Sequence, residues 1–93
     1  MTREIALPAR IDHPAVEALY AEVKEARGED LALDASQVSH LGASGLQLLI
    51  AAANSWTRDG HILSLRDPSE KFSEHLQMLG LELSYFSKAE AEQ

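Results

Sequence analysis

The sequence predicts an α/β domain in which three helices cover a mostly parallel sheet of about four strands. Short apolar runs alternate along the chain with segments in which apolar residues recur at helical spacing. Each helical segment is followed by a glycine (Gly28, Gly60, Gly80), which is typical of helix ends. Alternation of strands and helices places helices on a mostly parallel sheet, so we expect one domain of this class over all 93 residues.

The first strand is predicted from Glu4 to Ile11, where apolar residues alternate with polar ones. Pro8 lies inside this run and cannot donate a backbone hydrogen bond, so we expect an edge strand or a broken one. The first helix then starts at residues 12–14, with Asp12 or His13 as the cap and a proline in the first turn, and runs to Arg27.

A second strand is predicted over residues 30–35, and the connection at 36–41 can include one further strand pairing. A central helix follows and ends at Gly60. Its buried face is predicted to comprise Leu46, Leu49, Ile50, Ala53 and Trp56. Leu48 and Ala52 lie off this face. They are buried if the helix is flanked on two sides, and otherwise they are exposed and available to a partner.

The third strand is predicted over residues 61–66, and a third helix starts just after it. Asp67 is the expected cap, Pro68 the first helical residue, and Glu70 reaches back to the cap. The inward residues of this helix are expected to be Phe72, Leu76 and Leu79. A last strand is expected over 81–86, so the core spans about 4–86 and residues 87–93 form a frayed tail.

Composition and charge exclude several classes of function. The chain has no cysteine, which excludes disulfides and thiolate chemistry and fits a reducing compartment. Its net charge of −7, with scattered Lys and Arg residues, argues against nucleic-acid binding. No long apolar segment is present, so we expect a cytoplasmic protein without a signal peptide or membrane insertion. An acidic surface suits a basic patch on a protein partner, although it also serves solubility alone.

The sequence offers no constellation of catalytic or metal-binding residues. The four histidines, at 13, 40, 61 and 75, are too widely spaced for a local metal motif. Asp34 follows a strand, where α/β folds place ligands, but no second carboxylate stands near it, and a turn role explains it. No phosphate loop, dinucleotide fingerprint or nucleophile elbow is present. We therefore expect no enzyme activity, no metal and no cofactor.

Ser44 stands at the start of the central helix and has two interpretations. As the helix cap, its hydroxyl would contribute about 1 kcal/mol of stability. As a modified residue, it would carry a phosphate of about two negative charges at a helix N-terminus, which the helix dipole tolerates. Such a phosphate would change an exposed surface without unfolding the domain. The same turn, from Gly42 to Leu46, can also bind a free anion or nucleotide, which gives a third reading as a sensor domain.

The segment LALDASQVSHLGASGLQ, which starts at Leu31, resembles the signature of STAS domains, the family of anti-sigma factor antagonists. The signature consists of an apolar strand, an Asp, a short loop, an apolar residue and then Asp-Ser-Ser/Thr-Gly-Leu at the start of a helix. A looser similarity extends over DGHILSLRDPSEKFSEHLQMLGLE, from Asp59. The resemblance implies a STAS-type sandwich and a binding module without enzyme activity.

The resemblance also implies which residues carry the function. Members of the family dock on a kinase or switch protein through the loop and the start of the central helix. Ser44 falls on the serine that a partner kinase phosphorylates in the sigma-regulating branch, while Gly42 and Ala43 replace the usual Asp and Ser. The implied partner-binding residues are Ser36, Ser39, His40, Gly42, Ala43, Ser44, Gly45, Gln47 and Leu48.

Besides the sigma-regulating branch, two further branches of the family are relatives that the resemblance suggests. Glycine in place of the signature Asp is similar to small STAS proteins that accompany bacterial chemotaxis kinases and are thought to act as adaptors for them. A third relative is the STAS subunit of bacterial lipid-transport ABC complexes, which clamps an ATPase. The partner implied by the first two branches is a kinase, whereas the third implies a constitutive subunit of a transporter.

Overall fold

The structure is a computed structural model that describes residues 2–81 and Phe86. Within them the elements are β1 (Thr2–Ala6), β2 (Arg10–Ile11), α1 (His13–Glu25), β3 (Asp30–Asp34), β4 (His40–Leu41), α2 (Ala43–Asp59), β5 (Leu63–Arg66) and α3 (Glu70–Met78). Strands β1, β3 and β5 form a parallel sheet in the order β1–β3–β5, and β2 and β4 form a second parallel pair. The predicted α/β class, with three helices and a mostly parallel sheet, is confirmed.

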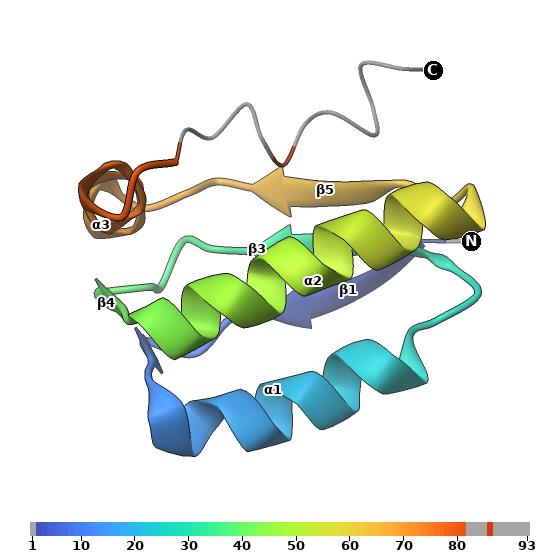
Figure 1. Cartoon of the computed structure of the whole chain (residues 1–93), viewed down its shortest axis with the longest axis horizontal. Coiled ribbons are helices and arrows are strands. Elements are labelled where there is room, and N and C mark those ends of the chain that lie inside the picture. Colours follow the sequence, from blue (N-terminus) through green and yellow to red (C-terminus); the bar gives the residue numbers. More distant parts are fainter. Residues whose placement is uncertain (1, 82–85, 87–93) are drawn as a thin grey trace.

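Figure 1 shows how the helices are arranged around the sheet. Helix α2 crosses in front of the three-stranded sheet, α1 runs alongside α2, and α3 is seen nearly end-on at the side where β4 meets α2. The start of α2, β4 and α3 therefore lie at the same end of the molecule. This end carries the segment that the sequence analysis singled out.

The predicted first strand is both broken and at an edge, as Pro8 indicated. The chain leaves the sheet after Leu7, whose N–H donates to the carbonyl oxygen of Asp34 at 2.9 Å. It then forms β2, which pairs with β4 through Arg10 opposite His40 and Ile11 opposite Leu41. The additional pairing expected within residues 36–41 is therefore confirmed. It ties the loop before α2 to the N-terminal part of the chain.

The core is apolar throughout, and α2 contributes to it from two directions. Leu46, Leu49 and Trp56 are buried, as predicted, while Ile50 and Ala53 are only half-buried. Ala52 is also buried, and Leu48 half-buried, because α1 flanks α2. Ala52 is therefore buried because α2 is flanked on two sides, which is the first of the two explanations given for residues off the predicted buried face.

The C-terminal part of the chain departs from the prediction at Leu79. This side chain was expected to face inward, but it is 40% exposed, because α3 ends at Met78 and the chain then turns at Gly80 with a φ of 91°. The predicted last strand at 81–86 and the frayed tail at 87–93 lie largely outside the described residues. Phe86 itself is buried.

The predicted cap Asp67 is wrong, and so is the interpretation of Ser44 as a cap. The N-cap of α2 is Gly42, so Ser44 is the second helical residue and makes no capping hydrogen bond. The N-cap of α3 is Ser69, whose Oγ accepts from the Phe72 N–H at 3.0 Å. Asp67 instead adopts a left-handed backbone with a φ of 46°, which turns the chain out of β5 and moves the helix start two residues later.

Replacing Ser69 with alanine is expected to destabilise the domain by about 1–2 kcal/mol, because the hydroxyl caps α3 and also donates to the carbonyl oxygen of Val38. Asp67→Gly is the matched control at the cap that the sequence predicted. Glycine adopts the left-handed backbone freely, so that change should stay within about 0.5 kcal/mol. Urea unfolding of the two variants measures both changes in the free energy of unfolding. A larger loss of stability for Asp67→Gly than for the Ser69 variant would contradict the assignment of Ser69 as the cap of α3.

Candidate functional site

The loop that leads into α2 begins with a turn built by Asp34. Its Oδ1 accepts a hydrogen bond from the Ser36 N–H at 2.9 Å. That backbone bond, a hydrogen bond from the Ser36 side chain and the nearby charge of Arg66 together hold the pKa of Asp34 below its usual value. The carboxylate therefore serves the turn, which agrees with the simpler of its two interpretations.

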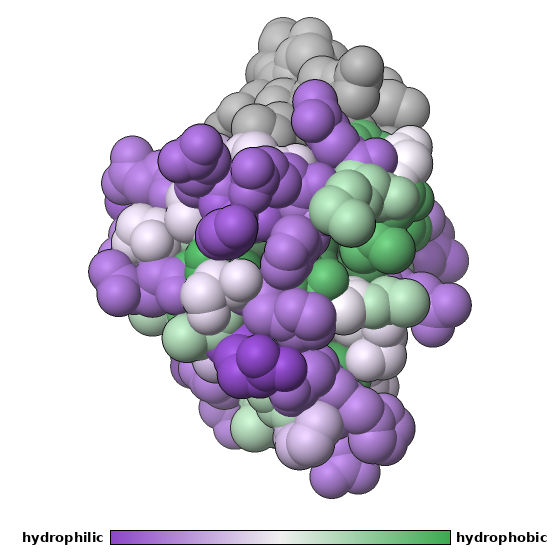
Figure 2. Space-filling view, turned by 90° about the vertical axis from the view of Figure 1, so that its left-hand side faces the viewer, coloured by the Kyte–Doolittle hydropathy of each residue, from purple (hydrophilic) through white to green (hydrophobic). Residues whose placement is uncertain are grey.

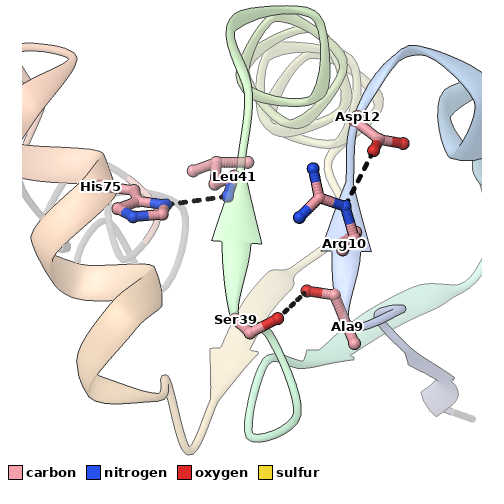
Figure 3. Close-up of polar contacts among 6 residues, drawn as sticks. All are labelled: Ala9, Arg10, Asp12, Ser39, Leu41 and His75. Carbon is pink, nitrogen blue, oxygen red and sulfur yellow. Dashed lines mark hydrogen bonds and ion pairs between the residues drawn. The ribbon is translucent and has the colours of Figure 1, made fainter.

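The middle of the loop is fastened to the residue that precedes β2. The N–H groups of Ser39 and His40 both donate to the carbonyl oxygen of Ala9, at 2.7 and 3.1 Å. The Ser39 hydroxyl donates to the same oxygen at 3.1 Å, as drawn in Figure 3. Val38, one residue earlier, is buried. The loop is therefore fixed in place, and the hydroxyl of Ser39 is engaged within the protein.

The first turn of α2 rests directly on β2. A Cβ atom at Gly45 would lie 2.5 Å from Cγ2 and 2.7 Å from the carbonyl oxygen of Ile11, which is fully buried. A Cβ at Gly42 would come no closer than 3.5 Å to that oxygen, which is ordinary contact. Close approach of the helix to β2 therefore requires glycine at position 45 and leaves position 42 open.

Ser44 lies in this first turn, between exposed Ala43 and buried Gly45. Its side chain is half-buried, and its hydroxyl makes no capping hydrogen bond within the part of the chain that the structure describes. Ala43 and Gln47 beside it are exposed, and Leu48 one turn later is half-buried. The helix thus presents a partly accessible hydroxyl among small and uncharged side chains.

Helix α3 brings a second histidine to the loop. His75 Nδ1 accepts a hydrogen bond from the Leu41 N–H at 3.0 Å (Figure 3), and its ring meets that of His40 edge-on at 5.3 Å. Acceptance at Nδ1 requires that this nitrogen carries no proton. The sequence predicts His40 in the loop, but no local pattern indicates that His75, 35 residues further on, contacts it.

A shallow groove of about 180 Å³ lies beside this contact. It is lined by His40, Leu41, His75, Met78 and Leu79. Met78 is 81% exposed, although it is one of the most apolar residues of α3. Figure 2 faces this end of the molecule and shows a largely polar surface with one larger apolar area at the upper right. No sequence pattern pointed to Met78 and Leu79 as part of a surface, because helical spacing predicts a buried Leu79.

Replacing His75 with leucine should cost about 1–2 kcal/mol of stability, because the partly buried Leu41 N–H would lose its acceptor. Gln77→Leu makes a similar change at an exposed site on α3 and should be close to neutral. Thermal and urea unfolding compare the two variants. Equal stability of both would show that the histidine does not hold α3 against β4.

Among residues 2–81 and Phe86, no three metal-ligating side chains come together. No helix in this part of the chain has the length and apolar character needed to cross a bilayer. A loop held by hydrogen bonds, a half-buried serine at a helix start and an apolar groove thus lie together at one end of a small α/β domain.

Comparison with known families identifies this domain. The family model described as "Mlab, STAS domain" matches residues 2–83, so the chain belongs to the STAS domain family. STAS domains are in general non-enzymatic modules that regulate or bind other proteins. No curated protein matches the sequence. The resemblance found in the segment from Leu31 is therefore confirmed, and it extends over nearly the whole chain.

Proposed function

We propose that this protein is a non-enzymatic signalling adaptor that docks on a partner kinase, either an anti-sigma-type kinase or a chemotaxis histidine kinase. The docking surface is the loop and the first two turns of α2. Its members are Ser36, Ser39, His40, Gly42, Ala43, Ser44, Gln47 and Leu48. Gly45, which the family signature also implied, is buried against Ile11 and supports this surface from beneath. The observation that carries the proposal is the position of Ser44 in the first turn of α2, where its side chain is half-buried and its hydroxyl caps nothing.

The position of Ser44 suits a reversible charge. A phosphate on the second residue of a helix lies near the free N–H groups of the first turn and the positive end of the dipole. The domain would therefore keep its stability when about two negative charges are added there. A partner that packs closely on this turn would instead meet a bulky, hydrated group. Phosphorylation would release the partner while the adaptor stays folded.

The surroundings of Ser44 also suit a protein partner. Gly42 and Ala43 carry no side chain beyond a Cβ, so a partner can approach the backbone of the helix start. Met78 and Leu79 add exposed apolar surface next to His40. Exposed methionine is common at protein-binding surfaces because its flexible side chain adapts to different contacts. These residues extend the docking surface toward α3.

A second candidate function is a constitutive subunit of an ABC-type lipid transporter, bound to its ATPase. The name Mlab in the matching family model favours this candidate. The same surface would then be permanently covered, and Ser44 would stay unmodified. A third, an anion or nucleotide sensor, predicts that phosphate or a nucleotide raises the melting temperature of the isolated protein.

A site-specific photocrosslinker tests these candidates. p-Benzoylphenylalanine replaces Gln47 on the docking surface, and Thr57, exposed at the other end of α2, serves as the matched control. The protein is irradiated in the native cells, and the crosslinked partner and the Ser44 peptide are read by mass spectrometry. A kinase crosslinked from position 47 and not from 57 supports the proposal. An ATPase with unmodified Ser44 selects the transporter subunit, and equal crosslinking at both positions contradicts the docking surface.

A further inference from the structure

A second surface, between α1 and α2, lies outside most of the docking surface. Here a groove is formed by Tyr20, Lys24, Leu48, Ala51, Ser55 and Trp56, among others. We propose that this groove binds a helical segment of a protein partner that presents one apolar side chain flanked by acidic residues. The inference goes beyond the proposed docking function, because only Leu48 belongs to both surfaces.

The floor of the groove is apolar, and the wall that α2 forms carries no charged residue. Trp56 and Ala52 are buried beneath it, and Leu48 is half-buried at its side. Although a quarter of the chain is charged, α2 carries no charged residue before Arg58. Ala43, Gln47 and Ala51 are nevertheless exposed. An uncharged exposed helix face beside an apolar groove is typical of a protein-binding surface.

The size of the groove decides what can fill it. Its volume is about 120 Å³. Pockets for small molecules usually measure roughly 300–1,000 Å³, whereas a cavity of about 150 Å³ is enough for benzene. The groove between α1 and α2 therefore accommodates one apolar side chain and not a lipid or cofactor. Figure 1 shows α1 and α2 running alongside each other, so a partner helix can follow the line between them.

The charges at the rim select an acidic occupant. Lys24 and Arg27 are the charged residues that line the groove, and no carboxylate lines it within the described residues. Arg27 already contacts Asp59, with its Nη2 2.8 Å from Oδ2. Lys24 makes no ion pair with a carboxylate of the described part of the chain. Within residues 2–81 and Phe86, Lys24 is therefore the unpaired positive charge at the rim of this groove. The net charge of the chain is −7, but charges farther than about 8 Å are screened at physiological salt.

Two synthetic helical peptides test the inference. Both carry the same leucine anchors and no tryptophan, and one has glutamate where the other has lysine beside each anchor. Trp56 is the only tryptophan of the chain and lies in the groove, so its emission reports occupancy there, while anisotropy of the labelled peptide gives the affinity. We expect saturable binding of the glutamate peptide with a change in Trp56 emission, weakened by salt.

Variants locate the contact. Lys24→Glu should weaken binding of the glutamate peptide about five- to tenfold, since an exposed ion pair is replaced by a repulsion. Lys71→Glu, the same charge reversal on α3, should leave the affinity unchanged. Ala51→Phe fills the groove from the protein's own chain and should abolish binding while the protein stays folded.

Several outcomes would overturn the inference. They are binding of neither peptide, equal or tighter binding of the lysine peptide, and equal effects of Lys24→Glu and Lys71→Glu. Self-association that changes Trp56 emission without any peptide, seen by sedimentation, would assign the groove to a second copy and would also overturn it. None of these outcomes depends on Ser44, so the proposed docking function can stand or fall separately.

Discussion

Replacing Gly45 with alanine is expected to destabilise the domain by about 2–3 kcal/mol, although alanine is the better helix former. The added Cβ would come within 2.5 Å of the Ile11 side chain and 2.7 Å of its carbonyl oxygen. The oxygen belongs to backbone that is held in β2 by pairing with β4, so it cannot move aside without loss of that pairing. The start of α2 would have to lift away from β2, which would also displace the docking surface.

Gly42→Ser is the matched control for this prediction. It also adds a Cβ next to Ile11, but at 3.5 Å, and it supplies a hydroxyl at the N-cap of α2. We expect it to leave stability unchanged or raise it by a few tenths of a kcal/mol. Urea unfolding of both variants measures the difference. If Gly45→Ala were as stable as Gly42→Ser, the close packing of α2 on β2 would be incorrect.

The largest effect on binding is expected at Ser44. If the proposed docking is correct, Ser44→Asp should weaken binding to the proposed partner kinase by at least about tenfold, because one desolvated charge at a contact costs more than about 1.4 kcal/mol. The same change should leave the stability of the free protein unchanged or raise it by about 0.3–1 kcal/mol, since a carboxylate near a helix N-terminus is favourable. Loss of binding without loss of stability is the signature of a charge switch.

Two variants control this experiment. Ser44→Ala should keep the affinity and cost less than about 0.5 kcal/mol of stability, because the hydroxyl caps nothing. Thr57→Asp adds the same charge at the far end of α2 and should leave docking unchanged. Isothermal titration against the kinase gives the affinities. An aspartate variant that binds as tightly as the unmodified protein would exclude the switch.

The alternation of strands and helices could be predicted from the sequence because the spacing of apolar residues and the glycines and prolines at element ends are local properties. Pro8 correctly predicted a break in the first strand, because proline has no backbone N–H to donate to a neighbouring strand in any fold. The caps were not readable, because Asp67 and Ser69 are both good capping residues, and the choice depends on the left-handed turn at Asp67. Gly42 caps α2 with no side chain at all, so the interpretation of Ser44 as the cap is wrong and its other interpretation stays a proposal.

The candidate site was partly predictable for a similar reason. The loop and the start of α2 are contiguous in sequence, and the family signature marks them. The contribution of α3 depends on contacts between distant residues, such as His75 with Leu41, which no local pattern encodes. Exposure of Met78 and Leu79 follows from the end of the helix, and helix ends are the least certain feature of a sequence-based prediction.

Hydrogen exchange of the complex with the proposed partner kinase tests the central claim most directly. Amide exchange of the free and bound protein is compared peptide by peptide. Docking through the loop and the start of α2 predicts slower exchange over residues 36–48 in the complex, with little change at 57–66, and loss of that protection when Ser44 is phosphorylated. A stable complex in which residues 36–48 exchange as they do in the free protein would contradict the account.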